Sequence, residues 1–179
     1  MSKYIYGLII ALFLYVAGSE VYNSTNKKSA KSTRLACHES AITFERVYQP
    51  ERVQEMIETF KSGNVELKSK FKLAEFMESK MGRYITIEEI DAMFKEQIAK
   101  HHVKKENSKN LIINYFVYEN DKEDPGKKTK KSKLYAGYLR LIFILEGEKV
   151  YSFQIDFKDL EGKDIPQKVV CTVDSLLSL

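Results

Sequence analysis

The sequence lacks tryptophan and holds only three prolines and eight glycines among its 179 residues. It also lacks the motifs of common enzymes: there is no P-loop, no dinucleotide-binding fingerprint, no GxSxG elbow and no HExxH zinc motif. Zinc-finger, RNP-like and helix-turn-helix patterns are missing too, and the net charge is only +4, so no nucleic acid is indicated as a partner. We therefore expect a protein that is not an enzyme, with no catalytic residue, no resident metal and no cofactor.

Cysteine is nearly absent as well, since only Cys37 and Cys171 occur and no CxxC motif exists. An even pair in an exported protein predicts a disulfide. It would close a loop over most of the chain and stabilise the fold by on the order of 4 kcal/mol in the chain-entropy account. Two unpaired buried thiols are the alternative. A metal site that adds His38 and His101 would require both cysteines to be reduced.

Long hydrophobic runs are confined to the N-terminus, where no charged residue occurs from Tyr4 to Ser19. Lys3 precedes this run, and Val16-Ala17-Gly18 offers small residues at the positions that an export peptidase reads. We predict that residues 1–18 are a signal peptide or an uncleaved membrane anchor, although the run is shorter than the roughly 20 apolar residues of a full span. A cytoplasm-facing domain or a buried helix remains open. The expected location is the periplasm.

Three helices are expected in the first half of the domain. Pro50 begins the first, which ends at Gly63. The second runs from Val65 to Met81, with apolar residues on one face. The third begins at Thr86, which forms a capping box with Glu89, and ends near His101.

Strands are expected in the second half. The first is Leu111 to Glu119, and a long hairpin follows from Leu134 to Phe157, with a two-residue turn at Glu146-Gly147 or Gly147-Glu148. A last strand is expected from Lys168 to Val173, whereas residues 37–48 suit a short helix or a strand. The prediction is an α+β fold in which three helices precede a four-stranded antiparallel sheet. Residues 19–36 are expected to form a flexible basic tether, and residues 37–179 a single α+β domain.

This order of elements, over residues 45–175, is similar to that of NTF2-like and cystatin-like domains. The resemblance implies a curved antiparallel sheet wrapped around helices. Small periplasmic domains of bacterial secretion machines use this shape behind one N-terminal anchor.

The two-residue turn sets which side chains share a face of the hairpin. It places Tyr138, Ile142 and Ile144 with the apolar side of the second arm, and we expect the helices to cover that face. The opposite face then carries Leu139, Leu141 and Phe143 beside polar neighbours, as an interface patch does. The alternative is that residues 37–48 or the C-terminal leucines cover these three side chains.

Two further sites are candidates. Arg140 lies in an apolar strand and could bind an anion or a small ligand in the concave face of the sheet, together with Tyr138, Tyr151 and Phe153; a structural ion pair or a position at the rim is the alternative. A loop rich in lysine could contact anionic lipid or only solubilise the chain; its lysines are Lys127, Lys128, Lys130, Lys131 and Lys133.

The sequence therefore favours an exported protein that binds other envelope proteins or itself, in a complex such as a secretion system or a flagellar motor. A small-ligand module around Arg140 is the alternative.

Overall fold

The computed structural model describes residues 34–104, 107–126 and 134–179. The predicted signal peptide or anchor, most of the predicted tether and the lysine-rich loop lie outside these residues. Within the described ranges, no helix is both long and apolar enough to cross a membrane. Arg34 to Ala36, which were assigned to the tether, are described, and Arg34 forms an ion pair with Glu45 at 2.6 Å, so the folded part begins at least three residues earlier than predicted.

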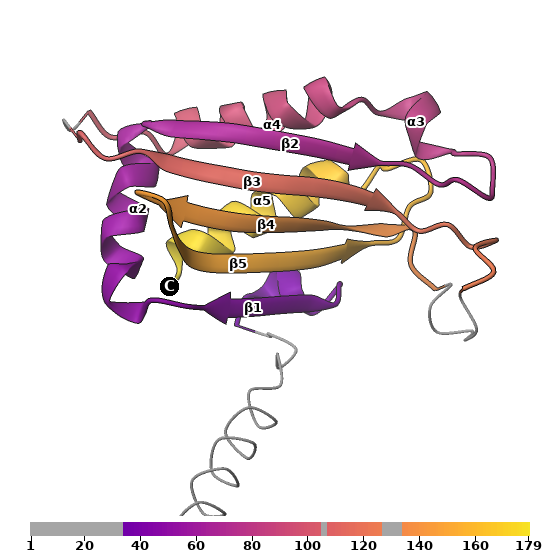
Figure 1. Ribbon diagram of the computed structural model, residues 1–179, viewed down its shortest axis with the longest axis horizontal. Coiled ribbons are helices and arrows are strands. Elements are labelled where there is room, and N and C mark those ends of the chain that lie inside the picture. The colour runs from indigo at the N-terminus through magenta and orange to yellow at the C-terminus, as the bar shows by residue number, and fades with distance from the viewer. Residues whose placement is uncertain (1–33, 105–106, 127–133) are drawn as a thin grey trace, which may run out of the picture. The chain divides into compact units, whose positions relative to one another are not determined.

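Helices and strands are interspersed in the first half of the described residues, and three strands and a helix follow (Figure 1). In chain order they are η1 (Ala36–His38), β1 (Thr43–Val47), η2 (Pro50–Arg52), α2 (Val53–Ser62), β2 (Val65–Lys72), α3 (Met81–Tyr84), α4 (Ile87–Lys100), β3 (Leu111–Glu119), β4 (Gly137–Leu145), β5 (Glu148–Phe157) and α5 (Ile165–Leu177).

The five strands form one mixed sheet in the order β1-β5-β4-β3-β2. β2 and β3 are parallel, and the other neighbouring strands are antiparallel. Parallel neighbours need a crossover, which the segment containing α3 and α4 provides. The predicted four-stranded antiparallel sheet after three helices is therefore wrong, and with it the arrangement that the NTF2-like and cystatin-like resemblance implied.

The predicted second helix is the strand β2 in its first half. Its sequence Val-Glu-Leu-Lys-Ser-Lys-Phe-Lys places Val65, Leu67 and Phe71 on the side that packs against the core and charged side chains on the other. Leu67 and Phe71 are four residues apart, a spacing that fits both a helical repeat and two repeats of a strand. Lys68 and Lys70, which lie between them, alternate with the inward residues as a strand requires, and this alternation distinguishes the strand from a helix.

The predicted last strand is the helix α5. Its run Val-Val-Cys-Thr-Val is rich in β-branched residues, which favour strands locally. Ile165, Val169 and Leu176 nevertheless lie at helical spacing and are fully buried, and Pro166 lies in the first turn, where its missing N–H costs nothing. Burial of this face against the sheet outweighs the local preference.

Several predicted features are confirmed. α2 ends at Gly63, whose φ of 78° is left-handed, and β3 has the predicted bounds. Thr86 and Glu89 form the capping box at the start of α4. The hairpin turns through Glu146 and Gly147, both with positive φ, as a type I′ turn requires. The open choice for residues 37–48 resolves into the short helix η1 and the edge strand β1.

A β-bulge in the hairpin determines which face of the sheet each side chain occupies. Leu145 pairs with Glu148 and Ile144 with Lys149, but Phe143 pairs with Tyr151, so Val150 is an extra residue on β5. Its carbonyl accepts a 2.8 Å hydrogen bond from the Tyr48 amide. Beyond the bulge, this one extra residue reverses which side chains of β5 share a face with a given side chain of β4.

The core lies between the sheet and the helices α4 and α5; in Figure 1 α5 lies behind the strands, α4 runs alongside β2 at the edge of the sheet, and α2 lies at one end of the sheet. We call the covered side the inner face. It carries alternate residues of the three central strands, all at most 2% exposed: Leu111, Ile113, Tyr115, Val117, Leu139, Leu141, Phe143, Tyr151, Phe153, Ile155 and Phe157.

Candidate functional site

The opposite side of the sheet, the outer face, is a broad surface with an apolar centre. Its central strands β3 and β4 present Ile112, Asn114, Phe116, Tyr118, Tyr138, Arg140, Ile142 and Ile144. Six of these eight side chains are apolar or aromatic, and in Figure 1 no labelled helix lies in front of them. Sheet faces in contact with water usually carry polar side chains. An apolar centre of this kind is typical of a surface that binds something.

Aromatic rings gather at one end of this centre. Tyr138 packs against Tyr118 and Phe116, with ring centroids 4.9 and 5.6 Å apart, and burial raises the pKa of the Tyr138 hydroxyl. Isoleucines occupy the other end. Between them, the side-chain oxygen of Asn114 is buried and has no hydrogen-bond partner among the described residues. A docked group with an N–H or O–H could satisfy this oxygen.

Cationic side chains surround the apolar centre. Lys68, Lys70 and Lys72 of β2 are in register with Asn114, Phe116 and Tyr118, so they point to the same side of the sheet. On the other flank, the Arg46 guanidinium and the Lys149 ammonium lie 4.8 and 4.9 Å from the centre of the Tyr48 ring. With Arg140, the outer face has six cations against the two carboxylates of Glu66 and Asp156, and it is strongly positive.

The three side chains predicted to form an interface are core residues instead. Leu139 and Leu141 are 0% exposed and Phe143 is 1% exposed, because the Val150 bulge turns them to the inner face with Tyr151 and Phe153. An apolar sheet surface does exist, but its side chains are those that were expected beneath the helices.

The predicted ligand site around Arg140 does not form. Tyr138 and Arg140 point to the outer face, whereas Tyr151 and Phe153 are buried on the inner face. The sheet separates the two pairs, so no cavity can contain all four. Arg140 is exposed and opposite Phe116 and Gln154, in agreement with a position at the surface.

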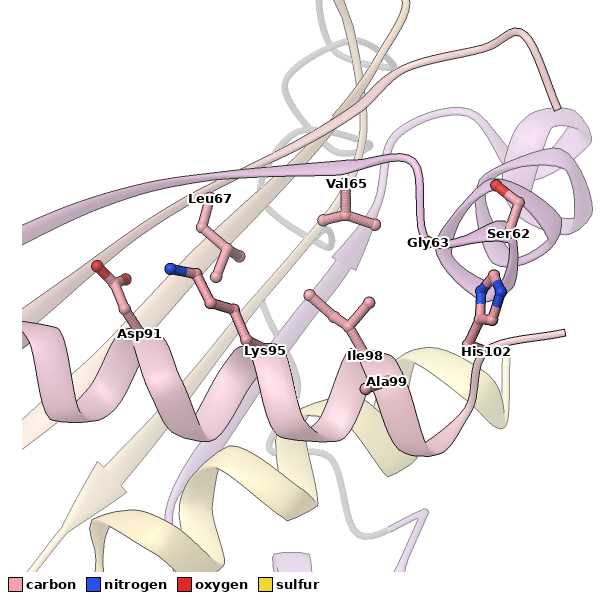
Figure 2. Close-up of a pocket in the computed structure, with 9 residues that line it drawn as sticks. All are labelled: Ser62, Gly63, Val65, Leu67, Asp91, Lys95, Ile98, Ala99 and His102. Atoms are coloured by element: carbon pink, nitrogen blue, oxygen red, sulfur yellow. The ribbon is translucent and has the colours of Figure 1, made fainter. Parts of the chain in front are cut away.

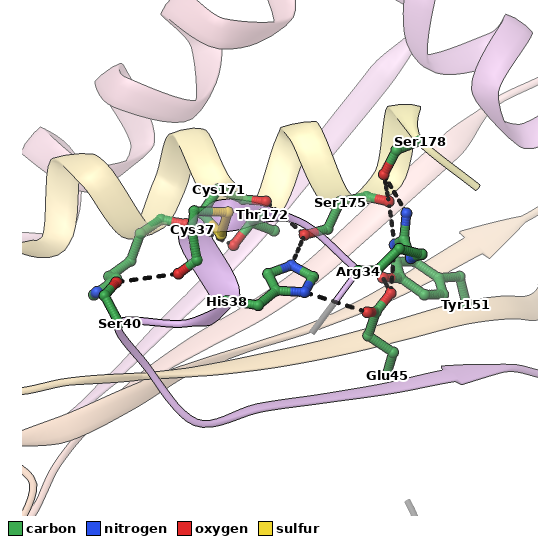
Figure 3. Close-up of a disulfide and its surroundings, with 11 residues drawn as sticks. Arg34, Cys37, His38, Ser40, Glu45, Tyr151, Cys171, Thr172, Ser175 and Ser178 are labelled. Carbon is green, nitrogen blue, oxygen red and sulfur yellow. Dashed lines mark hydrogen bonds and ion pairs between the residues drawn. A yellow bond between two sulfur atoms is a disulfide. The ribbon is translucent and has the colours of Figure 1, made fainter. Parts of the chain in front are cut away.

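Cys37 and Cys171 form a disulfide that joins η1 to α5, as predicted, with Cα atoms 5.9 Å apart (Figure 3). A polar cluster lies beside it. Glu45 accepts hydrogen bonds from Tyr151 at 2.7 Å and from Arg34 at 2.6 Å, and Arg34 also donates to the Ser175 carbonyl at 2.8 Å.

His38 in this cluster resembles part of a hydrolase triad, but it cannot act as one. Its Nε2 is 2.7 Å from the Ser175 hydroxyl and its Nδ1 is 3.8 Å from Glu45. The serine proton is already donated to the Cys171 carbonyl at 2.6 Å, so the serine oxygen accepts from the histidine, the reverse of what nucleophilic activation needs. His38 and Ser175 are both 0% exposed, and no substrate could reach them.

The same cluster contains the histidine of the conceivable metal site. Cys37, His38 and Cys171 offer ligand atoms within 4.8 Å of one another, whereas His101 is not part of this group. Both sulfurs are committed to the disulfide. Burial lowers the pKa of His38, an effect larger than the opposing attraction of Glu45. The cluster therefore reads as a neutral, structural support for the link between η1 and α5.

A groove of about 440 Å³ lies between the edge strand β2 and the helix α4 (Figure 2). Val65, Leu67 and Ile98 form its apolar part, and Asp91, Lys95 and His102 its polar rim. The Asp91 carboxylate is held by hydrogen bonds from the Tyr115 hydroxyl at 2.5 Å and from Ser69 at 3.1 Å. Sequence reasoning missed this groove because it assigned residues 65–72 to a helix.

Two buried carboxylates at the end of β3 hold the loop between β2 and α3. Glu119 accepts backbone hydrogen bonds from Ala74, Lys80 and Met81 at 3.0 to 3.1 Å. Asp121 accepts from the amides of residues 75 and 76 at 2.7 and 2.6 Å. These bonds fix the far end of β2 in position.

No protein-family model, curated protein or solved structure matches this chain.

Proposed function

We propose that this chain is an exported, non-enzymatic protein-binding module, an assembly component of an envelope complex, and that it docks a partner on the outer face of its sheet. The observation that carries the proposal is the apolar centre on β3 and β4, which no described helix covers. Tyr, Phe and Arg, which that surface presents, are among the residues enriched at protein interfaces.

The disulfide supports the location. A Cys37–Cys171 bond indicates an oxidising compartment, because cytosolic thiols are kept reduced. An N-terminal signal or anchor in residues 1–18 would deliver the domain to such a compartment, and the periplasm is the one we propose.

Charge decides what kind of partner suits the surface. Two copies meeting through their outer faces would bring six cations against six, with two carboxylates on each side to offset them. Like charges facing each other disfavour that pairing. A different protein with an apolar centre and an acidic rim fits better, so we propose a heterologous partner rather than self-association through this face.

Photo-crosslinking in cells tests the proposal. A benzoylphenylalanine in place of Tyr138 should crosslink to one envelope protein, and a second substitution, Ile142→Glu, should remove the crosslinked product while the domain stays folded. The same photo-reactive residue at Lys163, an exposed position on the connection before α5, is the control and should give no such product. Crosslinks of equal yield at both positions, or none at Tyr138, would contradict docking on the outer face.

A further inference from the structure

β2 has one edge that no described strand pairs with, since it is the last strand in the sheet order. Such an edge presents a row of backbone N–H and C=O groups that another extended chain can pair with. Eight residues, Val65–Lys72, form this edge. The backbone hydrogen bonds that Glu119 and Asp121 accept from the following loop hold one end of the strand, and the left-handed turn at Gly63 fixes the other end.

α4 makes this edge a binding site, because the helix lies alongside β2 next to its unpaired edge (Figures 1 and 2). A sixth strand added beside β2 would have its inner side chains over the groove, where Ile98 and Ala99 of α4 and Leu67 of β2 form an apolar lining. The groove volume of about 440 Å³ accommodates a few aliphatic side chains.

The outer side chains of an added strand would meet a different environment. Cross-strand neighbours lie close together on each face of a sheet. On the outer face these neighbours would be Glu66, Lys68, Lys70 and Lys72, three cations and one carboxylate, which alternate with the inward residues. Lys68 and Lys72 have exposed acidic neighbours, Glu66 at 3.3 Å and Glu75 at 3.9 Å, and such solvated pairs are easily exchanged.

We infer that the β2–α4 edge binds an extended peptide segment in which aliphatic residues alternate with acidic ones, and that it pairs with β2 as a sixth strand. The aliphatic side chains enter the groove and the carboxylates face the three lysines. A second copy of β2 is excluded as the occupant, because it would place a row of lysines against a row of lysines. This site is separate from the apolar centre on β3 and β4, although its three lysines also belong to the cationic flank of the outer face.

The probe is a fluorescein-labelled synthetic nonapeptide of alternating valine and glutamate, titrated with oxidised full-length protein and followed by anisotropy. We expect saturable binding at least tenfold tighter than that of the matching valine–lysine peptide. A peptide with N-methyl groups on the edge that faces β2 should lose at least tenfold in affinity, because it cannot form the backbone ladder. Amide signals of residues 65–72 should shift on binding.

Variants separate strand pairing from general attraction. The triple reversal K68E/K70E/K72E should invert the preference between the two peptides, whereas the control K149E/K158E/K163E, with the same change in net charge at exposed positions, should not. Ala99→Trp should weaken binding at least tenfold by filling the groove. Ile142→Glu should leave peptide binding unchanged, so that failure here and failure of the outer-face proposal can be told apart.

Absence of binding at millimolar peptide would overturn the inference. Binding that tolerates N-methylation, or that both triple variants weaken equally, would show only ionic attraction and would overturn it as well.

Discussion

The most discriminating prediction uses two neighbouring residues of β4, which point to opposite sides of the sheet because side chains alternate along a strand. Leu141 is 0% exposed on the inner face, opposite Phe153. Ile142 is partly exposed on the outer face, between Asn114 and Ser152. The same substitution, to glutamate, should have very different consequences at the two positions.

The expected magnitudes follow from burial. Loss of a buried leucine alone costs about 2–5 kcal/mol, and a carboxylate left among apolar side chains adds a desolvation cost, so Leu141→Glu should lose about 5 kcal/mol or more. That is between a third and all of the roughly 5–15 kcal/mol that holds a domain together. Ile142→Glu places its carboxylate between two polar neighbours at the surface and should cost about 1 kcal/mol or less.

Urea unfolding of oxidised protein, followed by circular dichroism, measures both changes. Equal losses, or a larger loss for Ile142→Glu, would refute the assignment of faces. Deletion of Val150 is a second test: it removes the extra residue and would turn Tyr151 and Phe153 toward solvent, so the variant should not fold. A stable, cooperatively unfolding deletion variant would show that the bulge does not set the register.

Four further results are expected. Burial depresses the pKa of His38, so the unfolded chain takes up a proton first as the pH falls through about 6.5, and the free energy of unfolding should drop by up to about 1.4 kcal/mol per pH unit below that value. In urea titrations, the loss of stability between pH 7.5 and 5.5 should be smaller for His38→Leu than for the parent. An unchanged loss would argue against His38 as the source of the pH dependence. Denatured, unreduced protein should contain no free thiol, and reduction of Cys37–Cys171 should lower stability by on the order of 4 kcal/mol; two reactive thiols would contradict the bond. Glu119→Gln replaces one accepting oxygen by a donor, so it should lower the free energy of unfolding by about 1–3 kcal/mol and speed hydrogen exchange of amides 74–81. Unchanged exchange would show that Glu119 does not hold this loop. Thr86→Ala removes the cap of α4 and should cost about 1 kcal/mol in thermal or urea unfolding, and no change would show that the capping box does not contribute.

The sequence allowed the local features to be predicted wherever one residue type has one physical explanation. Gly63 ends a helix because it adopts positive φ, and Thr86 with Glu89 begins one because both satisfy free amides. The disulfide followed from having two cysteines and an export-like N-terminus. These inferences depend on the chemistry of a few residues and not on what packs against them.

The failures arose where packing decides. Leu67 and Phe71 fit two periods, and the Val-Val-Cys-Thr-Val run favours a strand until a helical face is buried against the sheet. The sides of the hairpin depended on one extra residue, Val150, which nothing in the local sequence distinguishes from its neighbours.

The outer face had a signal that could have been read. β3 is apolar on both of its sides, with Asn114 as its only strongly polar residue before Glu119. A strand of this kind requires cover on both faces. The described helices cover one side only, and the remaining side is the surface on which we propose that a partner docks.

The disulfide has a mechanical consequence. A pulling force that enters at Arg34 reaches Cys37 after three residues and crosses the covalent bond directly to Cys171, eight residues before the last residue, Leu179. The chain between the two cysteines, which contains all five strands of the described sheet, carries no tension along this path. A protein held at its N-terminus and loaded near its C-terminal helix would therefore keep its sheet, and both surfaces proposed to bind partners, intact under forces that peel an unlinked edge strand from its neighbour.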